Sequence, residues 1–216
     1  MNRNRHKKPA EAYQPCSMAN LNRAVAVLNA GGIVAFPTET YYGLAADPFN
    51  PLALNHLFTL KQRDTAKPIM TLVDDRESLS VLVHEVPVVY LQLMEKFWPG
   101  PLTLIFPARV DLPTLLTGGT GTVGVRQSSH PFARQLLRAF GRPITATSAN
   151  ISGHDAAVDA HGVRAQFGSR IDMIFDGGLT SGKTGSTIVG VEESRIRLIR
   201  DGVIPYDDIV KTVQNG

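Results

Sequence analysis

Cysteine is almost absent from this chain, because Cys16 is the only one in 216 residues. A single cysteine cannot form an internal disulfide bond, and no second cysteine or nearby histidine gives it a partner for a metal ion. No apolar run approaches the roughly 20 residues that cross a bilayer, and the basic, polar N-terminus lacks the apolar core of a signal peptide. We therefore expect a cytoplasmic protein without disulfides or membrane segments.

Two common catalytic patterns are missing as well. The six histidines show no metal-ligand spacing, and the residue order shows no Ser/His/Asp or Cys/His arrangement. The chain has no internal repeat and no low-complexity linker. With 43% hydrophobic and 19% charged residues, the composition excludes disordered and fibrous classes, and 216 residues suit one well-buried core.

Positive charge is distributed unevenly. The net charge is +3, but the first eight residues hold four cations and no carboxylate, namely Arg3, Arg5, Lys7 and Lys8. The rest of the chain then has 18 cations against 19 carboxylates, a net charge of −1, which does not favour a generally basic nucleic-acid-binding body. We predict a basic flexible tail over residues 1–14, either a solvated leader or a weak RNA contact, and a single domain over residues 15–216.

Apolar runs and amphipathic segments alternate along the chain. Apolar or β-branched runs predict strands over residues 33–36, 68–73, 102–106, 123–126, 144–147, 171–175, 186–191 and 196–200. Caps and periodic apolar positions predict helices after Ser17 or Asn20, over 51–61 behind Asn50, after Asp74 or Asp75, over 87–97, over 131–140, near 158–167 and after Pro205. This order predicts an α/β fold with helices on both faces of a sheet, and the hairpin-like spacing of the last two strands indicates a mixed sheet.

Residues 177–184 match the phosphate-loop pattern G-x-x-x-x-G-K-[ST] letter for letter. A true phosphate loop needs a helix directly after it, so that the helix N-terminus and the loop amides cradle the phosphates. Here a β-branched segment with two glycines, residues 185–191, follows instead. We interpret the match as a flexible glycine turn between two strands.

The segment after the first predicted strand is polar and irregular. It holds Pro37, two threonines, Glu39, two tyrosines and Gly43, a composition that indicates a binding loop. One helix later, Lys61 and Arg63 stand beyond the apolar face, where a point charge and a planar fork are free to meet an anion such as a polyphosphate. Two cations at a helix end also suit the helix dipole alone.

Polar side chains also lie at the ends of later strands. Ser148 and Asn150 come just past a predicted strand, where α/β sheets commonly place ligands, although a turn or cap role is the alternative. A hydroxyl and an amide suit phosphate oxygens or a hydrated magnesium ion. Arg126 and Arg200 close two more strands, either as anion clamps or in surface ion pairs.

Five segments carry a combined pattern: FPTETYYGL from residue 36, LKQR from 60, WPGPLT from 98, VGVR from 123 and TSANISG from 147. Together they resemble the YrdC-like family, the L-threonylcarbamoyladenylate synthases. The resemblance implies an α/β, YrdC-like open twisted mixed sheet around a concave, positively charged pocket. It also implies that L-threonine, bicarbonate or CO2, and ATP give threonylcarbamoyl-AMP and pyrophosphate, for threonylcarbamoyladenosine modification of tRNA.

The resemblance implies roles for nine residues when it is carried over position by position. The expected nucleotide-binding residues are Lys61, Arg63, Ser148, Asn150, Ser186 and Arg200. The expected threonine and carbamate contacts are Thr38, Thr40 and Arg126, and the expected catalytic residues are Lys61, Arg63 and Arg126. ATP would arrive with Mg2+ bridging its phosphates, and no metal site is expected in the protein itself.

Two positions depart from the family pattern. Asp64 stands where the K-x-R segment is commonly followed by proline, and Gly185 replaces a frequent glutamate before Ser-Thr. The family pattern therefore does not predict the local geometry beside Arg63 and Ser186.

Two other functions compete with the synthase. One is an RNA-binding module of the same fold, which would show salt-sensitive RNA affinity and no nucleotide turnover. The other is a paralogue that acts on another carbamoyl or nucleotide substrate. If the synthase reading holds, the tRNA-threonylcarbamoyl transferase machinery is the expected partner.

Overall fold

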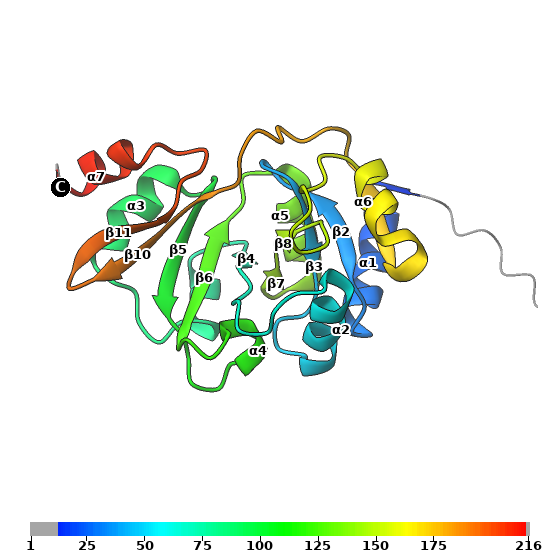
Figure 1. Cartoon of the computed structure of the whole chain (residues 1–216), viewed down its shortest axis with the longest axis horizontal. Helices are drawn as coiled ribbons and strands as arrows, with labels where there is room; N and C mark the ends of the chain where they lie inside the picture. Colours follow the sequence, from blue (N-terminus) through cyan, green and yellow to red (C-terminus); the bar gives the residue numbers. More distant parts are fainter. Residues whose placement is uncertain (1–12, 215–216) are drawn as a thin grey trace, which may run out of the picture.

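The computed structural model describes residues 13–214, and Figure 1 shows its strands in two groups with helices packed outside them. One sheet has the strand order β1-β9-β2-β3-β8 and the other has the order β11-β10-β5-β6-β4-β7. Each sheet contains parallel and antiparallel pairs, so both are mixed. The strands are β1 (Gln14–Pro15), β2 (Val34–Pro37), β3 (Tyr42–Ala45), β4 (Thr71–Val73), β5 (Leu102–Pro107), β6 (Thr122–Gln127), β7 (Ile144–Thr145), β8 (Thr147–Ser148), β9 (Met173–Asp176), β10 (Thr187–Glu192) and β11 (Arg195–Arg200).

The helices begin where the sequence provides caps. Ser17 accepts a hydrogen bond from the Asn20 amide at 3.4 Å, and Asn50 accepts one from the Leu52 amide at 3.0 Å, so both expected caps are confirmed. The helices are α1 (Met18–Asn29), α2 (Pro51–Lys61), α3 (Val89–Phe97), α4 (Thr114–Thr117), α5 (Pro131–Phe140), α6 (Ala160–Phe167) and α7 (Tyr206–Gln214), with 3-10 turns at Glu77–Val81 and Gly168–Arg170.

Helices cover both faces of the first sheet, as the alternating sequence pattern predicts. On one face α1 and α5 pack together, and Leu28 and Phe132 join Phe36 of β2 in a buried cluster. On the opposite face α2 and α6 supply Leu54 and Val163 to a larger cluster. Burial of these apolar faces is the main stabilising contribution that holds helices and sheet together.

The second sheet is covered by α3 and α7, which contact each other. Tyr90 of α3 is fully buried, and its hydroxyl donates to the carbonyl oxygen of Ile105 at 2.8 Å. The last two strands form the antiparallel hairpin that their spacing predicts. The hairpin and the two helices lie together at the left of Figure 1.

A single extended segment passes from one sheet to the other. β7 pairs with β4 of the second sheet, whereas β8 pairs with β3 of the first, and only Ala146 separates them. Thr145 reinforces the crossing because its hydroxyl donates to the Leu44 carbonyl at 3.0 Å and accepts from the Ala46 amide at 2.8 Å. The expected strand over residues 144–147 is therefore divided between two sheets.

Several local expectations need correction. The strand expected over residues 68–73 is only Thr71–Val73, because Pro68 lacks an amide donor and the Ile69 amide donates to the carbonyl oxygen of Leu116 in α4. The segment after Asp75 forms a 3-10 turn and no α-helix, although Asp75 does accept from the Ser78 amide at 2.8 Å. Helix α4 was not predicted, since four residues carry too little periodicity.

The ends of the described region add two observations. Gln14, which the sequence assigns to the tail, pairs with Phe175 of β9 and is buried, so the sheet extends into that segment. The expected basic side chains of the tail, Arg3, Arg5, Lys7 and Lys8, lie outside the described residues. None of the helices within residues 13–214 has the length and apolar character needed to span a membrane.

Residues 177–184 form an irregular connection between β9 and β10. The strand β10 follows, and no helix begins there, so these residues lack the helix N-terminus that a phosphate loop requires. The glycine-turn interpretation is confirmed.

Candidate active site

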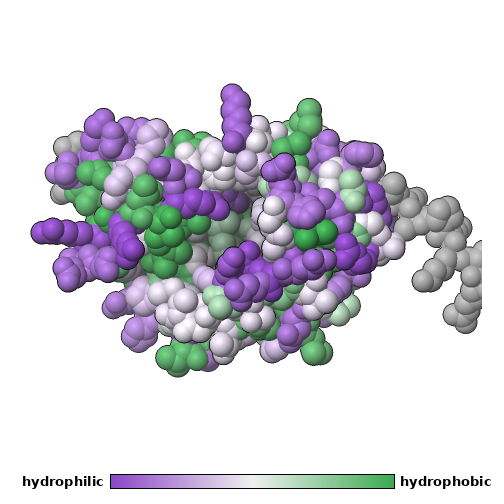
Figure 2. All heavy atoms as spheres, in the orientation of Figure 1, coloured by the Kyte–Doolittle hydropathy of each residue, from purple (hydrophilic) through white to green (hydrophobic). Residues whose placement is uncertain are grey.

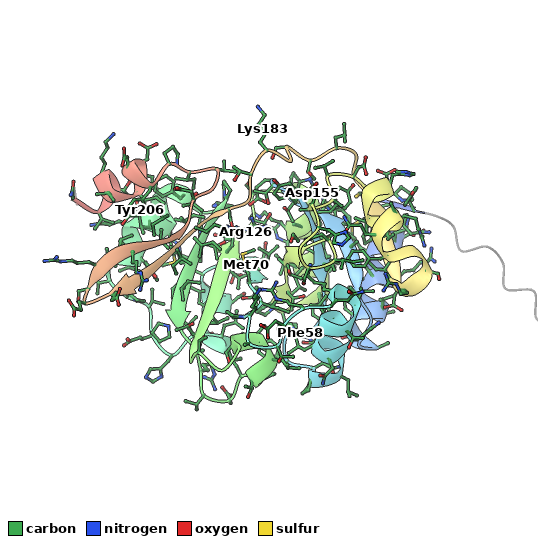
Figure 3. The ribbon with its side chains drawn as sticks, in the orientation of Figure 1. Phe58, Met70, Arg126, Asp155, Lys183 and Tyr206 are labelled. Carbon is green, nitrogen blue, oxygen red and sulfur yellow. The ribbon has the colours of Figure 1, made fainter. Side chains whose placement is uncertain are left out.

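A cavity of about 420 Å³ lies between the two sheets. Figure 3 places two of its lining residues, Arg126 and Met70, between the two groups of strands, and Figure 2 shows this face hollowed near its centre. Of the nine predicted site residues, Lys61 does not line the cavity and the other eight do: Thr38, Thr40, Arg63, Arg126, Ser148, Asn150, Ser186 and Arg200. Residues far apart in the sequence therefore converge on one cavity.

The lining of this cavity is cationic. Its arginine and carboxylate residues are Arg63, Arg126, Arg200 and Asp201, three cations against one anion. Low-dielectric walls strengthen the attraction of such a set for a charged ligand. The arrangement favours an anion with several negative charges.

Arg126, near the end of β6, is 2% exposed. Its Nη1 donates to the Thr40 hydroxyl at 3.4 Å and lies 3.5 Å from Oε1 of Glu39. Its Nε is buried and has no hydrogen-bond partner within the described part of the chain. Burial lowers the pKa of Arg126 and the Glu39 carboxylate opposes that shift. A buried cation beside a cavity, with part of its hydrogen-bonding capacity unused, favours an anionic ligand in that cavity.

The two threonines beside Arg126 form a compact hydroxyl pair. Thr38 Oγ1 lies 3.1 Å from Thr40 Oγ1 and donates to the Tyr41 carbonyl at 2.7 Å. Both side chains are buried, and the glycine turn packs on this loop because the Gly182 amide donates to the Thr40 carbonyl at 2.9 Å. The predicted threonine contacts therefore lie together at one side of the cavity.

Glu39 is a part of this arrangement that sequence reasoning did not assign. Its Oε2 accepts a hydrogen bond from the fully buried Ser128 hydroxyl, while Oε1 faces Arg126. Glu39 is not among the residues that line the cavity, so it supports Arg126 from outside the ligand space. The signal that could have identified it is the lone carboxylate in an otherwise uncharged binding loop.

Arg63 is fixed by the turn that follows it. Its Nε donates to the Lys67 carbonyl at 3.2 Å and its Nη2 to the Pro68 carbonyl at 2.9 Å. Asp64 shapes this turn, because its Oδ1 accepts from the Ala66 amide at 3.0 Å. The departure from the family pattern at Asp64 is thus compatible with an ordered Arg63.

Arg200, at the end of β11, is held by Ser186. Its Nη2 donates to the Ser186 carbonyl at 2.7 Å and to the Ser186 hydroxyl at 3.2 Å. The Ser186 hydroxyl in turn lies 2.8 Å from Thr103 Oγ1. Gly185 leaves room for this guanidinium, since a Cβ there would lie 2.8 Å from Nη2. Two of the predicted site residues therefore form one unit.

Lys61 differs from its expectation. The sequence suggests a cation free to meet an anion, but Lys61 is 1% exposed and its Nζ donates to the carbonyl oxygens of Ser148 at 2.5 Å and Asn150 at 2.7 Å. The expectation of a free ammonium is wrong, because the last turn of α2 points this side chain into the protein. Burial first, and the Arg63 cation second, lower the pKa of Lys61 to about 7.

A second hollow of about 820 Å³ lies elsewhere, between the segment 85–89 and strands β5, β10 and β11. It is larger, but its lining is mostly apolar and includes none of the nine predicted residues. The smaller cavity, with its cationic lining, is therefore the candidate active site. Within residues 13–214, no group of three His, Cys, Asp or Glu side chains is placed to hold a metal ion.

Comparison with known proteins gives a consistent family. A family model described as Sua5_yciO_yrdC, "Telomere recombination", matches residues 26–202. A protein of Pyrococcus abyssi named threonylcarbamoyl-AMP synthase is 39% identical over 190 residues, which cover 88% of this chain and 56% of that protein. A protein of the same name from Vibrio cholerae is 37% identical over 185 residues, 85% of this chain and 97% of that protein. The chain thus spans little more than half of the first relative and nearly all of the second.

Solved structures agree in fold. The structure of P. abyssi Sua5 complexed with L-threonine has a TM-score of 0.88 and 38% identity, covering 91% of this chain and 58% of that one. The structure of E. coli YciO has a TM-score of 0.80 at 23% identity, covering 91% and 95%, and at that identity it supports the fold alone. The open, mixed α/β architecture expected from the sequence is confirmed, with the strands divided between two mixed sheets where one was expected.

Proposed function

The chain belongs to the Sua5/YciO/YrdC family, and on that premise we propose that it is an enzyme that makes threonylcarbamoyl-AMP and pyrophosphate from L-threonine, bicarbonate or CO2, and ATP. In reaction terms it is a nucleotidyltransferase, since an adenylyl group passes from ATP to a carbamate oxygen. The observation that carries the proposal is the cationic cavity in which a buried, partly unpaired Arg126 adjoins the threonine pair 38 and 40.

The cavity divides into an amino-acid side and a phosphate side. On the first, Arg126 binds the carboxylate of threonine or the oxygens of its carbamate, and the Thr38 and Thr40 hydroxyls orient the ligand. The relative from P. abyssi was solved with L-threonine bound, which supports this assignment.

On the phosphate side, Arg63 and Arg200 neutralise the triphosphate, and Ser148, which lines the same cavity, offers its hydroxyl to a phosphate oxygen. Ser186 acts by fixing Arg200. Lys61 contacts Ser148 and Asn150 and lies outside the lining of this cavity. The aspartate Asp201 is the only carboxylate among the lining residues, so Mg2+ is held mainly by the phosphates and water.

The reaction needs no protein nucleophile. The amine of threonine, after losing a proton, adds to CO2 to form a carbamate, and a carbamate oxygen attacks the α-phosphorus of ATP as pyrophosphate leaves. The protein contributes by positioning the reactants and by neutralising charge that moves onto pyrophosphate. Removal of one such cationic contact costs about 3 kcal/mol, or roughly 10²–10³ in rate.

The product is an activated threonylcarbamoyl group, so its use requires a transferase that delivers the group to tRNA adenosine. We assign the tRNA-threonylcarbamoyl transferase machinery as the partner, and the cytoplasm, where tRNA and ATP are available, as the place of action. RNA contact by the basic N-terminal segment is a separate expectation. It would appear as salt-sensitive tRNA binding that is lost when residues 1–12 are removed.

One assay tests the function. The protein is incubated with ATP, Mg2+, L-threonine and bicarbonate, and threonylcarbamoyl-AMP is sought by mass spectrometry. We expect the product to vanish when threonine is omitted. An equal signal without threonine would support a paralogue with another substrate, and tRNA binding without any nucleotide turnover would support the RNA-binding alternative.

A further inference from the structure

The Lys61 ammonium has three N–H donors, and three oxygens surround it. They are the carbonyl oxygen of Ser148 at 2.5 Å, that of Asn150 at 2.7 Å and the side-chain Oδ1 of Asn150 at 3.4 Å. They belong to the last residue of β8 and to the turn that follows it. The donors of Lys61 are therefore used inside the protein. Lys61 does not line the main cavity, but it lines a smaller hollow of about 270 Å³ that shares Arg63, Ser148 and Asn150 with that cavity.

The backbone of Lys61 is also hydrogen-bonded to the same turn. Its carbonyl oxygen accepts from the Ser152 amide at 2.8 Å. Asn150 closes the turn from within, because its Oδ1 accepts from the Ser148 hydroxyl at 2.5 Å and its Nδ2 donates to the Ile151 and His154 carbonyls at 3.0 and 2.7 Å. The end of α2 and the turn are thus one hydrogen-bonded unit.

A change in backbone direction at Gln62 turns the side chains of Lys61 and Arg63 to different places. Gln62, between them, adopts φ 51° in the left-handed region and ends the helix. Lys61 consequently points into the protein, while Arg63 reaches the cavity. Ser148 also lines the cavity and pairs with Gly43 of β3, and its hydroxyl is held by the Asn150 side chain that Lys61 contacts.

We propose that Lys61 is a positioning residue, which fixes the turn of residues 148–152 so that Ser148 faces the substrate phosphates, and that it makes no direct contact with those phosphates. The proposal rests on the proposed function, because the phosphate site gives the turn its purpose. It assigns different tasks to the two cations of the K-x-R segment: Arg63 meets the ligand and Lys61 holds the part of the site beside it.

The first test uses the unaltered protein and an amine-reactive reagent at pH 8, with and without ATP and Mg2+. We expect exposed Lys67 to be modified quickly and Lys61 to stay unmodified in both samples, as read by peptide mass spectrometry. Rapid modification of Lys61 in the free protein, slowed by ATP, would overturn the proposal, because it would place the amine in the phosphate site.

The second test compares hydrogen exchange in Lys61→Met and Arg63→Met. Loss of the Lys61 contacts should speed exchange of the Ser152 and His154 amides at least tenfold, whereas Arg63→Met should leave them unchanged. Equal exchange in the two variants would contradict a positioning role. Lys61→Gln, which keeps a hydrogen-bond donor, should restore part of the protection and replaces Lys61→Met if that variant does not fold.

The third test is a double-mutant cycle on product formation with Ser148→Ala. If Lys61 acts through the turn, Lys61→Met combined with Ser148→Ala should be no slower than the slower single variant. Arg63→Met combined with Ser148→Ala should instead multiply the two losses. Multiplied losses for the Lys61 pair would sink the proposal. Absence of product with the unaltered protein would sink only the proposed function, since labelling and exchange do not depend on turnover.

Discussion

Oε1 of Glu39 lies 3.5 Å from Nη1 of Arg126, and the two side chains are 14% and 3% exposed. A cation this deeply buried needs a nearby anion, because desolvation disfavours its charged form. The Glu39 carboxylate also accepts a hydrogen bond from the Ser128 hydroxyl, and this bond fixes the orientation of the carboxylate. Arg126 is thus oriented before a ligand arrives.

Glu39→Gln should weaken both the fold and the threonine side of the site. Removing one partner of a buried ion pair leaves an uncompensated charge and typically costs about 3 kcal/mol of unfolding free energy. We expect that loss in urea unfolding, with a raised KM for threonine. The matched control is Glu192→Gln, whose ion pair with Arg197 is about two-thirds exposed and should cost less than about 1 kcal/mol. Equal effects of the two substitutions would contradict this account.

Arg126→Lys should remove threonine binding while the fold persists. A lysine keeps the charge but cannot supply the planar fork that reaches both the Thr40 hydroxyl and a ligand carboxylate. We expect L-threonine to raise the Tm of the unaltered protein and not that of the variant, and product formation to fall by about 10²–10³. Arg138→Lys, on an exposed face of α5, is the control and should behave as the parent.

Gly185→Ala tests how Arg200 is seated. The added methyl group would lie 2.8 Å from Arg200 Nη2, so the guanidinium must move and lose its bonds to Ser186. We expect ATP to bind roughly tenfold more weakly, the loss of about one charge-assisted hydrogen bond, with threonine binding unchanged. Lys183→Ala, an exposed change in the same connection, should alter neither. Unchanged ATP affinity in Gly185→Ala would remove Arg200 from the phosphate side.

The β10–β11 hairpin offers a stabilising change away from the site. Its two turn residues, Glu193 and Ser194, have φ values of 48° and 63°, which suit a type I′ turn and favour Asn-Gly. The double substitution Glu193→Asn with Ser194→Gly should raise the unfolding free energy by about 1 kcal/mol and the Tm by about 2–4 °C. Product formation should not change. A lowered Tm would show that the two native side chains contribute contacts beyond the turn.

Much of the fold and of the site follows from local sequence. The caps Ser17 and Asn50 and the succession of strands and helices along the chain were predictable because they depend on neighbouring residues, and eight predicted residues line one cavity. The division of residues 144–148 between two sheets could not be predicted, because it depends on partners such as Leu44 that lie about a hundred residues away. A period-two pattern gives a strand but not its neighbours.

Lys61 and Glu39 show the same limit for side chains. Sequence spacing put Lys61 at a helix end, where solvent exposure is the usual outcome, but the left-handed Gln62 and the turn after β8 bury it. Glu39 lies in the predicted binding loop, but its role depends on its ion pair with Arg126. Arg126 comes 87 residues later in the sequence, and β6 brings it to Glu39. Long-range pairing decides both roles.

The burial of Lys61 should give stability a pH dependence of known sign. Burial, and to a smaller degree Arg63, lower its pKa from 10.5 to about 7, so between those values the unfolded chain binds more protons than the folded one. The contribution of Lys61 to the free energy of unfolding therefore rises with pH across this window, by at most about 1.4 kcal/mol per pH unit.

Lys61→Met has no such proton to lose. The unfolding free energy of the unaltered protein should therefore exceed that of Lys61→Met by more at pH 8.5 than at pH 7. Urea titrations at these two pH values measure the difference, because all other groups titrate alike in both proteins. Lys67→Met, at an exposed position, should show no change in its difference with pH. If the Lys61→Met difference also stays constant, the ammonium keeps an ordinary pKa. The carbonyls of Ser148 and Asn150 would then compensate its burial in full.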